Sequence, residues 1–471
     1  MEKIELIKKQ IIDKVNGYLG KLDFNAEKFV ENAINLNKLM NHNCVYGTTA
    51  HHPIDFNFQY SNMGGSYLLG PCSVKQSIIY KSDIRGDELK CKGDILDDKN
   101  PDPLLFDEKI VINSSLLYKT LVHNNSNNSA APEEFSIRNT VSCHYANIHG
   151  ATTQSSFLGA FSTIDLMNMN SCVVGEFSYV QAGDLFQEKI DPGVIYIKSN
   201  DFCFQFKYKK EVIDKYIGVN DLFQPRGLIH DFISEKEAEF DTLFNVINID
   251  SADKTPDDSA VNQYAIIKGD TKIGSQVLVS QKAYLENAQM GDGSNAQENT
   301  YIINSTLSGM NVTAHGGKII NADIGFKTFV GFNSFLSGKE NARLQTGKNC
   351  IVMPHTIIDI SSSLKVPDNS IVWGFIASEQ DLKTNSITIE ELKSVNGTID
   401  IGDMNFQGKG NKFVDAFGHR IEHILEANGA CCDDDSIKGH AQYDKEISFN
   451  ILQVQKSGEN RGLYPSIRVR A

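Results

Sequence analysis

Three histidines lie close together in a part of the chain that is rich in small residues. His144 and His149 are five residues apart, and His123 lies a short distance upstream. Neutral imidazole is the commonest transition-metal ligand, and three imidazoles with an open fourth position make a catalytic zinc site. We therefore predict that His123, His144 and His149 bind zinc, and that the metal activates water for attack on a small molecule.

The spacing of these histidines limits how such a site is assembled. Five residues of extended chain span roughly 16 Å, whereas each zinc–nitrogen bond is only about 2 Å long. Either a corner of the chain folds His144 and His149 together, or a neighbouring subunit supplies one ligand. The second option predicts a cyclic oligomer, and a homotrimer suits a three-sided fold.

A six-residue repeat runs through residues 264–375. Apolar residues recur at Ile324, Val330 and Leu336, and small or polar residues follow them. An apolar residue at every sixth position favours a triangular parallel β-helix, in which each short strand turns one residue inward. An amphipathic α-helix would need a period of 3.6, and the glycines of this region would weaken it. These glycines are Gly274, Gly291, Gly325, Gly331 and Gly347.

With 471 residues, the chain is too long for a single compact core. Changes in sequence pattern predict a mainly β protein with two parallel β-helix units and helical flanking segments. The predicted parts are a helical N-terminal segment (1–44), a first β-helix (45–207), a helical linker (208–261), a second β-helix (262–376) and a mixed C-terminal extension (377–471).

The composition of the chain limits which kinds of molecule it can bind and where in the cell we expect it. The net charge of −14 argues against nucleic acid or an anionic membrane, which both attract excess lysine and arginine. No apolar run approaches the roughly 20 residues that span a bilayer, and we find no signal peptide. Nine cysteines without regular spacing fit a reducing compartment. We therefore expect a cytoplasmic protein that acts on a small molecule.

The tripeptide Arg85-Gly86-Asp87 stands upstream of the histidines. Its arginine and aspartate could pair with each other through a bidentate contact, or reach across a subunit interface from a corner. The order of this tripeptide, His123 and His144-x4-His149-Gly150 resembles the γ-class carbonic anhydrases. These are left-handed β-helix proteins with hexapeptide repeats. Flanking segments at 139–144, 157–162 and 171–175 are similar to that family as well.

The resemblance covers residues 45–200 and carries several implications. It implies that the three histidines bind zinc (or iron or cobalt) at a trimer interface, with one ligand from the neighbouring subunit. Arg85 and Asp87 resemble the ion pair that bridges those subunits. The implied function is that of a carbonic-anhydrase-like lyase, in which metal-bound hydroxide attacks CO2 or another small electrophile.

The chain departs from this family at one catalytic element. The family has an Asn-x-Gln-Asp sequence shortly before the first histidine, and its glutamine positions the metal-bound water. Ser115, Leu117 and Tyr118 stand at these positions here. Metal binding could therefore persist while the hydration activity is lost or altered.

The second β-helix resembles the same family, but it keeps the element that the first lacks and lacks ligands that the first has. Residues 291–298 are similar to the missing element, and His315 resembles the second ligand, but Ile303 and Ile320 occupy the other two ligand positions. We interpret this half as a degenerate copy. Three of its polar residues could still face a composite catalytic site, namely Asn295, Gln297 and Glu298.

Two other functions remain open. Left-handed β-helix acyltransferases use a histidine in a similar small-residue setting as a general base. His315 would then deprotonate a hydroxyl or amine, with acyl-CoA in a groove between subunits. A non-catalytic trimeric scaffold that keeps the metal is the third interpretation. The sequence alone leaves open whether the protein is an enzyme.

Overall fold

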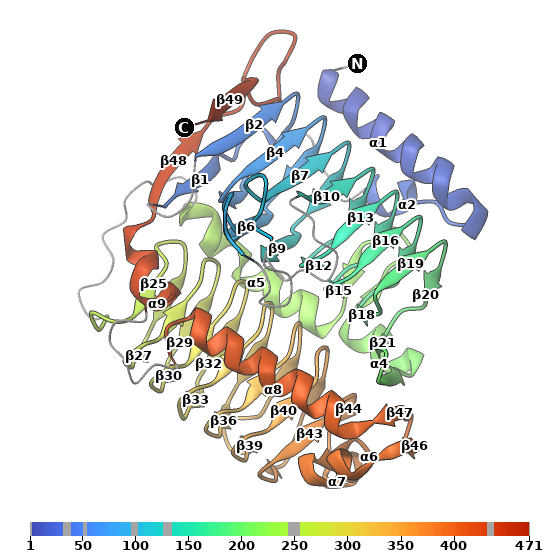
Figure 1. Ribbon diagram of the computed structural model, residues 1–471, viewed down its shortest axis with the longest axis vertical. Coiled ribbons are helices and arrows are strands. Elements are labelled where there is room, and N and C mark those ends of the chain that lie inside the picture. The colour runs from blue at the N-terminus through green and yellow to red at the C-terminus, as the bar shows by residue number, and fades with distance from the viewer. Residues whose placement is uncertain are drawn as a thin grey trace. The chain divides into compact units, whose positions relative to one another are not determined.

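The structure is mainly β, with many short parallel strands in stacked sheets (Figure 1). This computed structural model describes residues 2–31, 39–49, 54–95, 102–125, 134–243, 255–430 and 438–470. The chain divides into two compact units. The first comprises 1–193, 213–247 and 447–471, and the second comprises 194–212 and 248–446. Each unit contains one parallel β-helix; the six-residue repeat predicted the one in the second unit.

The β-helix of the first unit has three sheets. The first contains β1 (Cys44–Thr48), β3 (Tyr67–Leu69), β6 (Asp83–Glu88), β9 (Leu121–Asn125), β12 (Asn147–His149), β15 (Thr163–Asp165) and β18 (Tyr179–Gln181). The second contains β2 (Asp55–Gln59), β4 (Cys72–Lys75), β7 (Lys109–Asn113), β10 (Glu134–Arg138), β13 (Thr152–Gln154), β16 (Asn168–Asn170) and β19 (Asp184–Phe186). The third contains β5 (Ile78–Tyr80), β8 (Leu116–Tyr118), β11 (Val141–Ser142), β14 (Phe157–Leu158), β17 (Val173–Val174) and β20 (Lys189–Ile190).

The end of the chain closes the first coil. Strand β48 (Ser448–Leu452) pairs antiparallel with β1, and β49 (Ile467–Arg470) pairs antiparallel with β2. Because an unpaired first coil would present open strand edges, these two strands cap it. The unit also contains α1 (Lys3–Leu19), η1 (Gly20–Leu22), α2 (Glu27–Val30), α5 (Leu228–Leu243) and the hairpin of β23 (Gly218–Val219) with β24 (Pro225–Arg226). Helix α4 (Lys210–Tyr216) lies at the junction of the two units in the sequence.

The second unit repeats the three-sheet arrangement. Its first sheet contains β25 (Ala260–Val261), β28 (Leu278–Val279), β31 (Asn295–Ala296), β34 (Val312–Thr313), β37 (Phe329–Val330), β40 (Ile351–Val352), β43 (Ser370–Val372) and the antiparallel β45 (Ser386–Thr388). The next contains β26 (Ile266–Lys268), β29 (Tyr284–Glu286), β32 (Tyr301–Ile303), β35 (Lys318–Ile320), β38 (Phe335–Ser337), β41 (Ile357–Asp359) and β44 (Phe375–Ile376). The last contains β27 (Lys272–Ile273), β30 (Gln289–Met290), β33 (Thr306–Leu307), β36 (Ala322–Ile324), β39 (Leu344–Thr346) and β42 (Leu364–Val366).

Ile324, Val330 and Leu336 all lie in the hydrophobic interior of this coil, where the repeat placed them. The chain turns its corners at residues in the left-handed conformation, among them Asn287 and Asn304, whose φ angles are both 49°. Asparagine tolerates this conformation better than most residues do. The Asn287 amide donates to the Asn304 side chain at 3.0 Å, so stacked corners bind one another along the coil.

Antiparallel strands and helices complete the second unit. Residues 194–207, which the sequence assigned to the first β-helix, form β21 (Val194–Lys198) and β22 (Phe202–Lys207). Strand β21 pairs with β22, β22 pairs with β47 (Met404–Lys409), and β47 pairs with β46 (Asn396–Ile401), all antiparallel. Helix α8 (Gly410–Ala427) packs its apolar face along the coil (Figure 1). The shorter helices are α6 (Glu379–Thr384), α7 (Ile389–Ser394), α9 (His440–Tyr443) and η2 (Asp444–Glu446).

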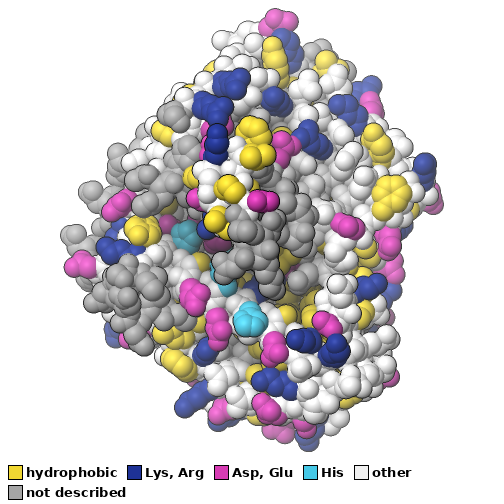
Figure 2. Space-filling view, viewed as in Figure 1, with side chains coloured by type: hydrophobic (Ala, Val, Ile, Leu, Met, Phe, Trp, Pro, Cys, Tyr) yellow, Lys and Arg dark blue, Asp and Glu magenta, His cyan; other side chains and the backbone are white. Residues whose placement is uncertain are grey.

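Acidic and basic side chains are interspersed over the face drawn in Figure 2. No helix among the described residues is both long and apolar enough to cross a membrane.

Candidate functional site

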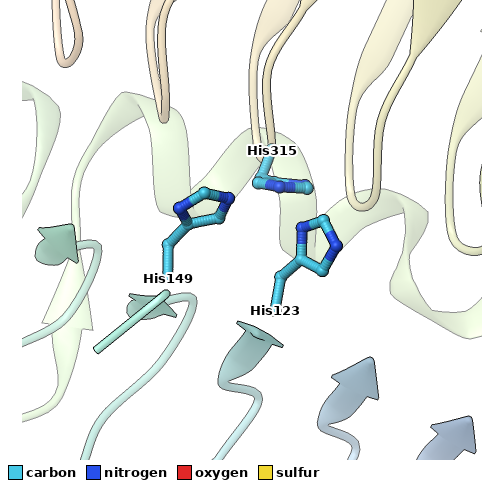
Figure 3. A group of neighbouring side chains, drawn as sticks. All are labelled: His123, His149 and His315. Carbon is cyan, nitrogen blue, oxygen red and sulfur yellow. The ribbon is translucent and has the colours of Figure 1, made fainter. Parts of the chain in front are cut away.

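His123 and His149 lie side by side on neighbouring strands of the first unit. They are register partners in β9 and β12, and their ring centroids are 5.2 Å apart (Figure 3). Side chains alternate along a strand. His123 and His149 therefore project from the face of the sheet opposite to Val122 and Ile148, and all four side chains are buried. A nitrogen of one ring lies within 4.8 Å of a nitrogen of the other, a separation that one metal ion could bridge.

A carboxylate holds the ring of His149. Asp165 is its register partner on β15, and Oδ1 of Asp165 lies 2.8 Å from Nδ1 of His149. The hydroxyl of Tyr179 donates to the other oxygen of Asp165. Both Asp165 and Tyr179 are fully buried. A histidine whose Nδ1 faces a carboxylate presents Nε2 to a metal or a proton.

Arg85 and Asp87 pair with each other within one chain. Nε of Arg85 donates to Oδ1 of Asp87 at 2.9 Å, and a second bond joins the guanidinium to Oδ2. Both residues are buried. Nε2 of His123 lies 3.8 Å from Oδ1 of Asp87 and from Oε1 of Glu88. The pair therefore lies beside His123, and its role between subunits stays a prediction.

His144 has different surroundings from the other two histidines. It lies at the corner before β12, where its ring centroid is 4.3 Å from Tyr118 and 6.1 Å from His230 of α5. Burial lowers its pKa well below the ordinary value, and Lys119 and His230 lower it further. These effects all favour the neutral form of the His144 imidazole. Among the described residues, it belongs to no group of three metal-ligating atoms within 4.8 Å of one another.

His315 of the second unit also faces a carboxylate. Its Nδ1 lies 2.5 Å from Oε2 of Glu298, and both side chains are buried. Glu298 and His315 stand at the same corner of successive coils. The amide of Gly316, the residue after His315, donates to the carbonyl of Glu298 at 2.9 Å. The ring of His315, also drawn in Figure 3, lies 5.3 Å from that of Phe332. A histidine and a carboxylate at this separation can act together in proton transfer.

The other two candidates of the second unit have different surroundings. The side chain of Asn295 is buried, and its oxygen accepts from the backbone of Thr313 at 3.1 Å. Gln297 is partly exposed, and its backbone amide donates to Thr313 at 3.1 Å. Glu298 is therefore the candidate whose carboxylate is paired with His315.

Sequence reasoning missed three buried polar residues: Asp165, Tyr179 and Lys318. Lys318 begins β35, three residues after His315, and burial lowers its pKa to about 7. Asp165 follows His149 by 16 residues, the length of one coil there. Coil length, once known, would have placed Asp165 next to His149.

Comparison with known proteins identifies the class. Residues 102–221 match the family described as hexapeptide repeat including loop. A crystal structure from Desulfovibrio desulfuricans G20, provisionally described as an acetyltransferase, is 46% identical with a TM-score of 0.93. The similarity covers 100% of this chain and 99% of that one. The chain therefore belongs to the hexapeptide-repeat family. No curated protein matches it.

Two further solved structures share much less with the chain. One, from Bacillus cereus and also provisionally described as an acetyltransferase, is 13% identical over 36% of this chain and 91% of its own, with a TM-score of 0.21. The other is the acetyltransferase domain of PglB from Neisseria gonorrhoeae. It is 12% identical over 31% of this chain and 65% of its own, with a TM-score of 0.14. TM-scores this low support no inference about fold.

Proposed function

We propose that the protein is an acyltransferase in which His315 is the general base. The observation that carries this proposal is the buried pair of His315 and Glu298, whose facing atoms are 2.5 Å apart. The provisional description of the relative from Desulfovibrio desulfuricans favours the same activity. Carbonic anhydrase activity, which the sequence favoured, has no such support among the comparisons.

The proposed reaction transfers an acyl group from acyl-CoA to a hydroxyl or amine. The carboxylate of Glu298 faces Nδ1 of His315 and keeps the proton of the neutral ring on that nitrogen, so Nε2 takes the proton of the attacking group. A bond forms between the attacking oxygen or nitrogen and the acyl carbon. The carbon–sulfur bond breaks, and CoA leaves as a thiolate that then takes up a proton. Glu298 also stabilises the imidazolium that forms during the transfer.

Release of free CoA thiol from acetyl-CoA, measured against a panel of small amines and alcohols, tests this proposal. We expect His315→Asn to lower the rate by about 100-fold or more, the usual contribution of a general base. Glu298→Gln should lower it less, because the base remains but loses its partner. His419→Asn, at an exposed position on α8, is the matched control. Equal rates for His315→Asn and the wild type would overturn the proposal.

We propose as a second candidate that His123 and His149 hold a metal ion in the first unit. Two buried imidazoles with nitrogens within 4.8 Å of each other, one of them held by Asp165, favour it. Zinc, iron or cobalt all accept imidazole. These residues supply two ligands, so a further donor must come from outside the pair. The family resemblance implies that a neighbouring subunit of a homotrimer supplies one histidine ligand, and His144 is the remaining histidine of the predicted triad.

When bound, such a metal would make hydroxide available near neutral pH for attack on CO2 or a similar electrophile. Leu117 stands where the family has its water-orienting glutamine, and its side chain is fully buried. We therefore expect slow CO2 hydration at best. A metal without turnover would favour the scaffold interpretation.

Metal analysis of the purified protein, together with a CO2 hydration assay, tests the second candidate. We expect metal in the wild type and its loss in His149→Ala, with His419→Ala as control. His144→Ala, analysed in the same way, tests the further donor that the resemblance implies. Light scattering determines whether the protein has three times the chain mass. Full metal occupancy in His149→Ala would exclude the site.

A further inference from the structure

We propose that Asp165 and Tyr179 are positioning residues, which fix the ring orientation of His149 and the nitrogen that carries its proton. The inference rests on the proposed metal site of the first unit and assigns that site its supporting residues. All three residues lie on adjacent strands of one sheet, β12, β15 and β18.

The β-helix itself brings these side chains together. His149 and Asp165 are register partners, so their side chains leave the sheet on the same side and at the same height. Tyr179 pairs with Thr163, two residues before Asp165. Its long side chain reaches along the strand, and its hydroxyl contacts the Asp165 carboxylate. Each partner therefore comes from a successive coil.

The chemistry of the carboxylate determines which nitrogen of His149 is protonated. An ionised aspartate can only accept hydrogen bonds, and a fully buried one needs donors. Tyr179 donates to Oδ2, and Nδ1 of His149 lies 2.8 Å from Oδ1. The proton of a neutral His149 must then be on Nδ1. Nε2 keeps its lone pair, as a metal ligand requires.

Burial makes this arrangement specific to Asp165. The carboxylate has no exposed surface, and His149 is 8% exposed. Replacing Asp165 with asparagine keeps the size of the side chain but lets its amide nitrogen face Nδ1. The ring would then accept a hydrogen bond at Nδ1 and carry its proton on Nε2, which no longer suits a metal.

Zinc titration against a chelating dye, with the full-length protein, is the first arm of the test. We expect Asp165→Asn to weaken zinc binding by about 10- to 100-fold, the usual effect of losing a partner of a metal-bound histidine. Tyr179→Phe should weaken it less, because the carboxylate remains. Asp184→Asn alters an exposed carboxylate of the same coil region and is the control. Thermal unfolding of each variant checks that it folds.

The second arm measures the proton of His149 without a metal. In protein with 15N-labelled histidine, the His149 ring signals are assigned by their absence from His149→Gln. We expect a protonated Nδ1 at neutral pH in the wild type and a shift toward a protonated Nε2 in Asp165→Asn. A wild type protonated on Nε2 would overturn the inference, whether or not it binds metal.

The two arms separate the possible failures. If the wild type binds no zinc but His149 is protonated on Nδ1, the metal function fails and the positioning role stands. If zinc binding needs His149 but is unchanged in Asp165→Asn, the positioning role fails and the metal site stands. A doubly protonated His149 at neutral pH would contradict both, because such a ring offers no lone pair.

Discussion

Helix α5 is attached to the first β-helix by a partly buried ion-pair network centred on Glu237. Lys81 contacts one oxygen of its carboxylate at 2.6 Å, and Lys119 contacts the other at 2.7 Å. Lys81 also contacts Asp241 at 2.7 Å. We predict that Glu237→Gln lowers the free energy that holds α5 on the β-helix. The shift in the pKa of Glu237 gives the size of that loss.

Burial alone would raise that pKa, but Lys119 and Lys81 outweigh it and lower it from 4.5 to about 2. A shift of about 2.5 units corresponds to roughly 3 kcal/mol, at about 1.4 kcal/mol per unit. The folded pKa lies below the unfolded one. The stabilisation is therefore present above about pH 4.5, and it is lost as the pH falls toward 2.

Hydrogen exchange of the α5 amides, followed by mass spectrometry at pH 7, measures this effect. A loss of about 3 kcal/mol should raise the exchange rate in α5 by roughly 100-fold. Glu235→Gln, at an exposed position on the same helix, should leave exchange unchanged. If Glu237→Gln changes exchange less than threefold, the network does not attach the helix as we describe.

Two other predictions concern the second unit. Because the pKa of Lys318 is lowered to about 7, the unfolded chain binds one more proton between pH 7 and about 10, and stability should rise with pH there. In urea unfolding, Lys318→Met should raise the free energy of unfolding by up to about 4 kcal/mol at pH 7 and by about half of that at pH 9. An equal increase at both pH values would contradict the lowered pKa of Lys318. A Cβ at Gly325 would lie 2.1 Å from the carbonyl oxygen of Gly347, so Gly325→Ala should cost about 3 kcal/mol. Gly418→Ala on α8, where a Cβ meets nothing within 4 Å, should instead stabilise the protein by about 1 kcal/mol, and equal melting temperatures for the two variants would refute this reasoning.

The part of the fold that contains the six-residue repeat could be predicted from the sequence. Ile324, Val330 and Leu336 lie in the interior because a six-residue period brings one side chain inward on each face. The capping of the first coil by β48 and β49 could not be predicted. Strand β48 pairs with a partner about 400 residues earlier, and antiparallel pairing at that distance leaves no local pattern.

The candidate site could be predicted only in part, for a similar reason. His123 and His149 share a sheet position because the coil between them returns the chain to the same height. His144 is a corner residue, so its ring faces α5 instead. No sequence pattern around Asp165 indicates that it lies beside His149, because that proximity depends on the length of one coil. The pairing of His315 with Glu298 depends on coil length in the same way.

The central claim is that His315 transfers a proton during acyl transfer. The most direct measurement is the rate of thiol release from acetyl-CoA by the wild type and by His315→Asn, with the best acceptor found for the wild type. We expect a fall of about 100-fold or more in kcat, with the fold of the variant intact by circular dichroism. A His315→Asn variant that releases thiol at the wild-type rate would contradict the claim.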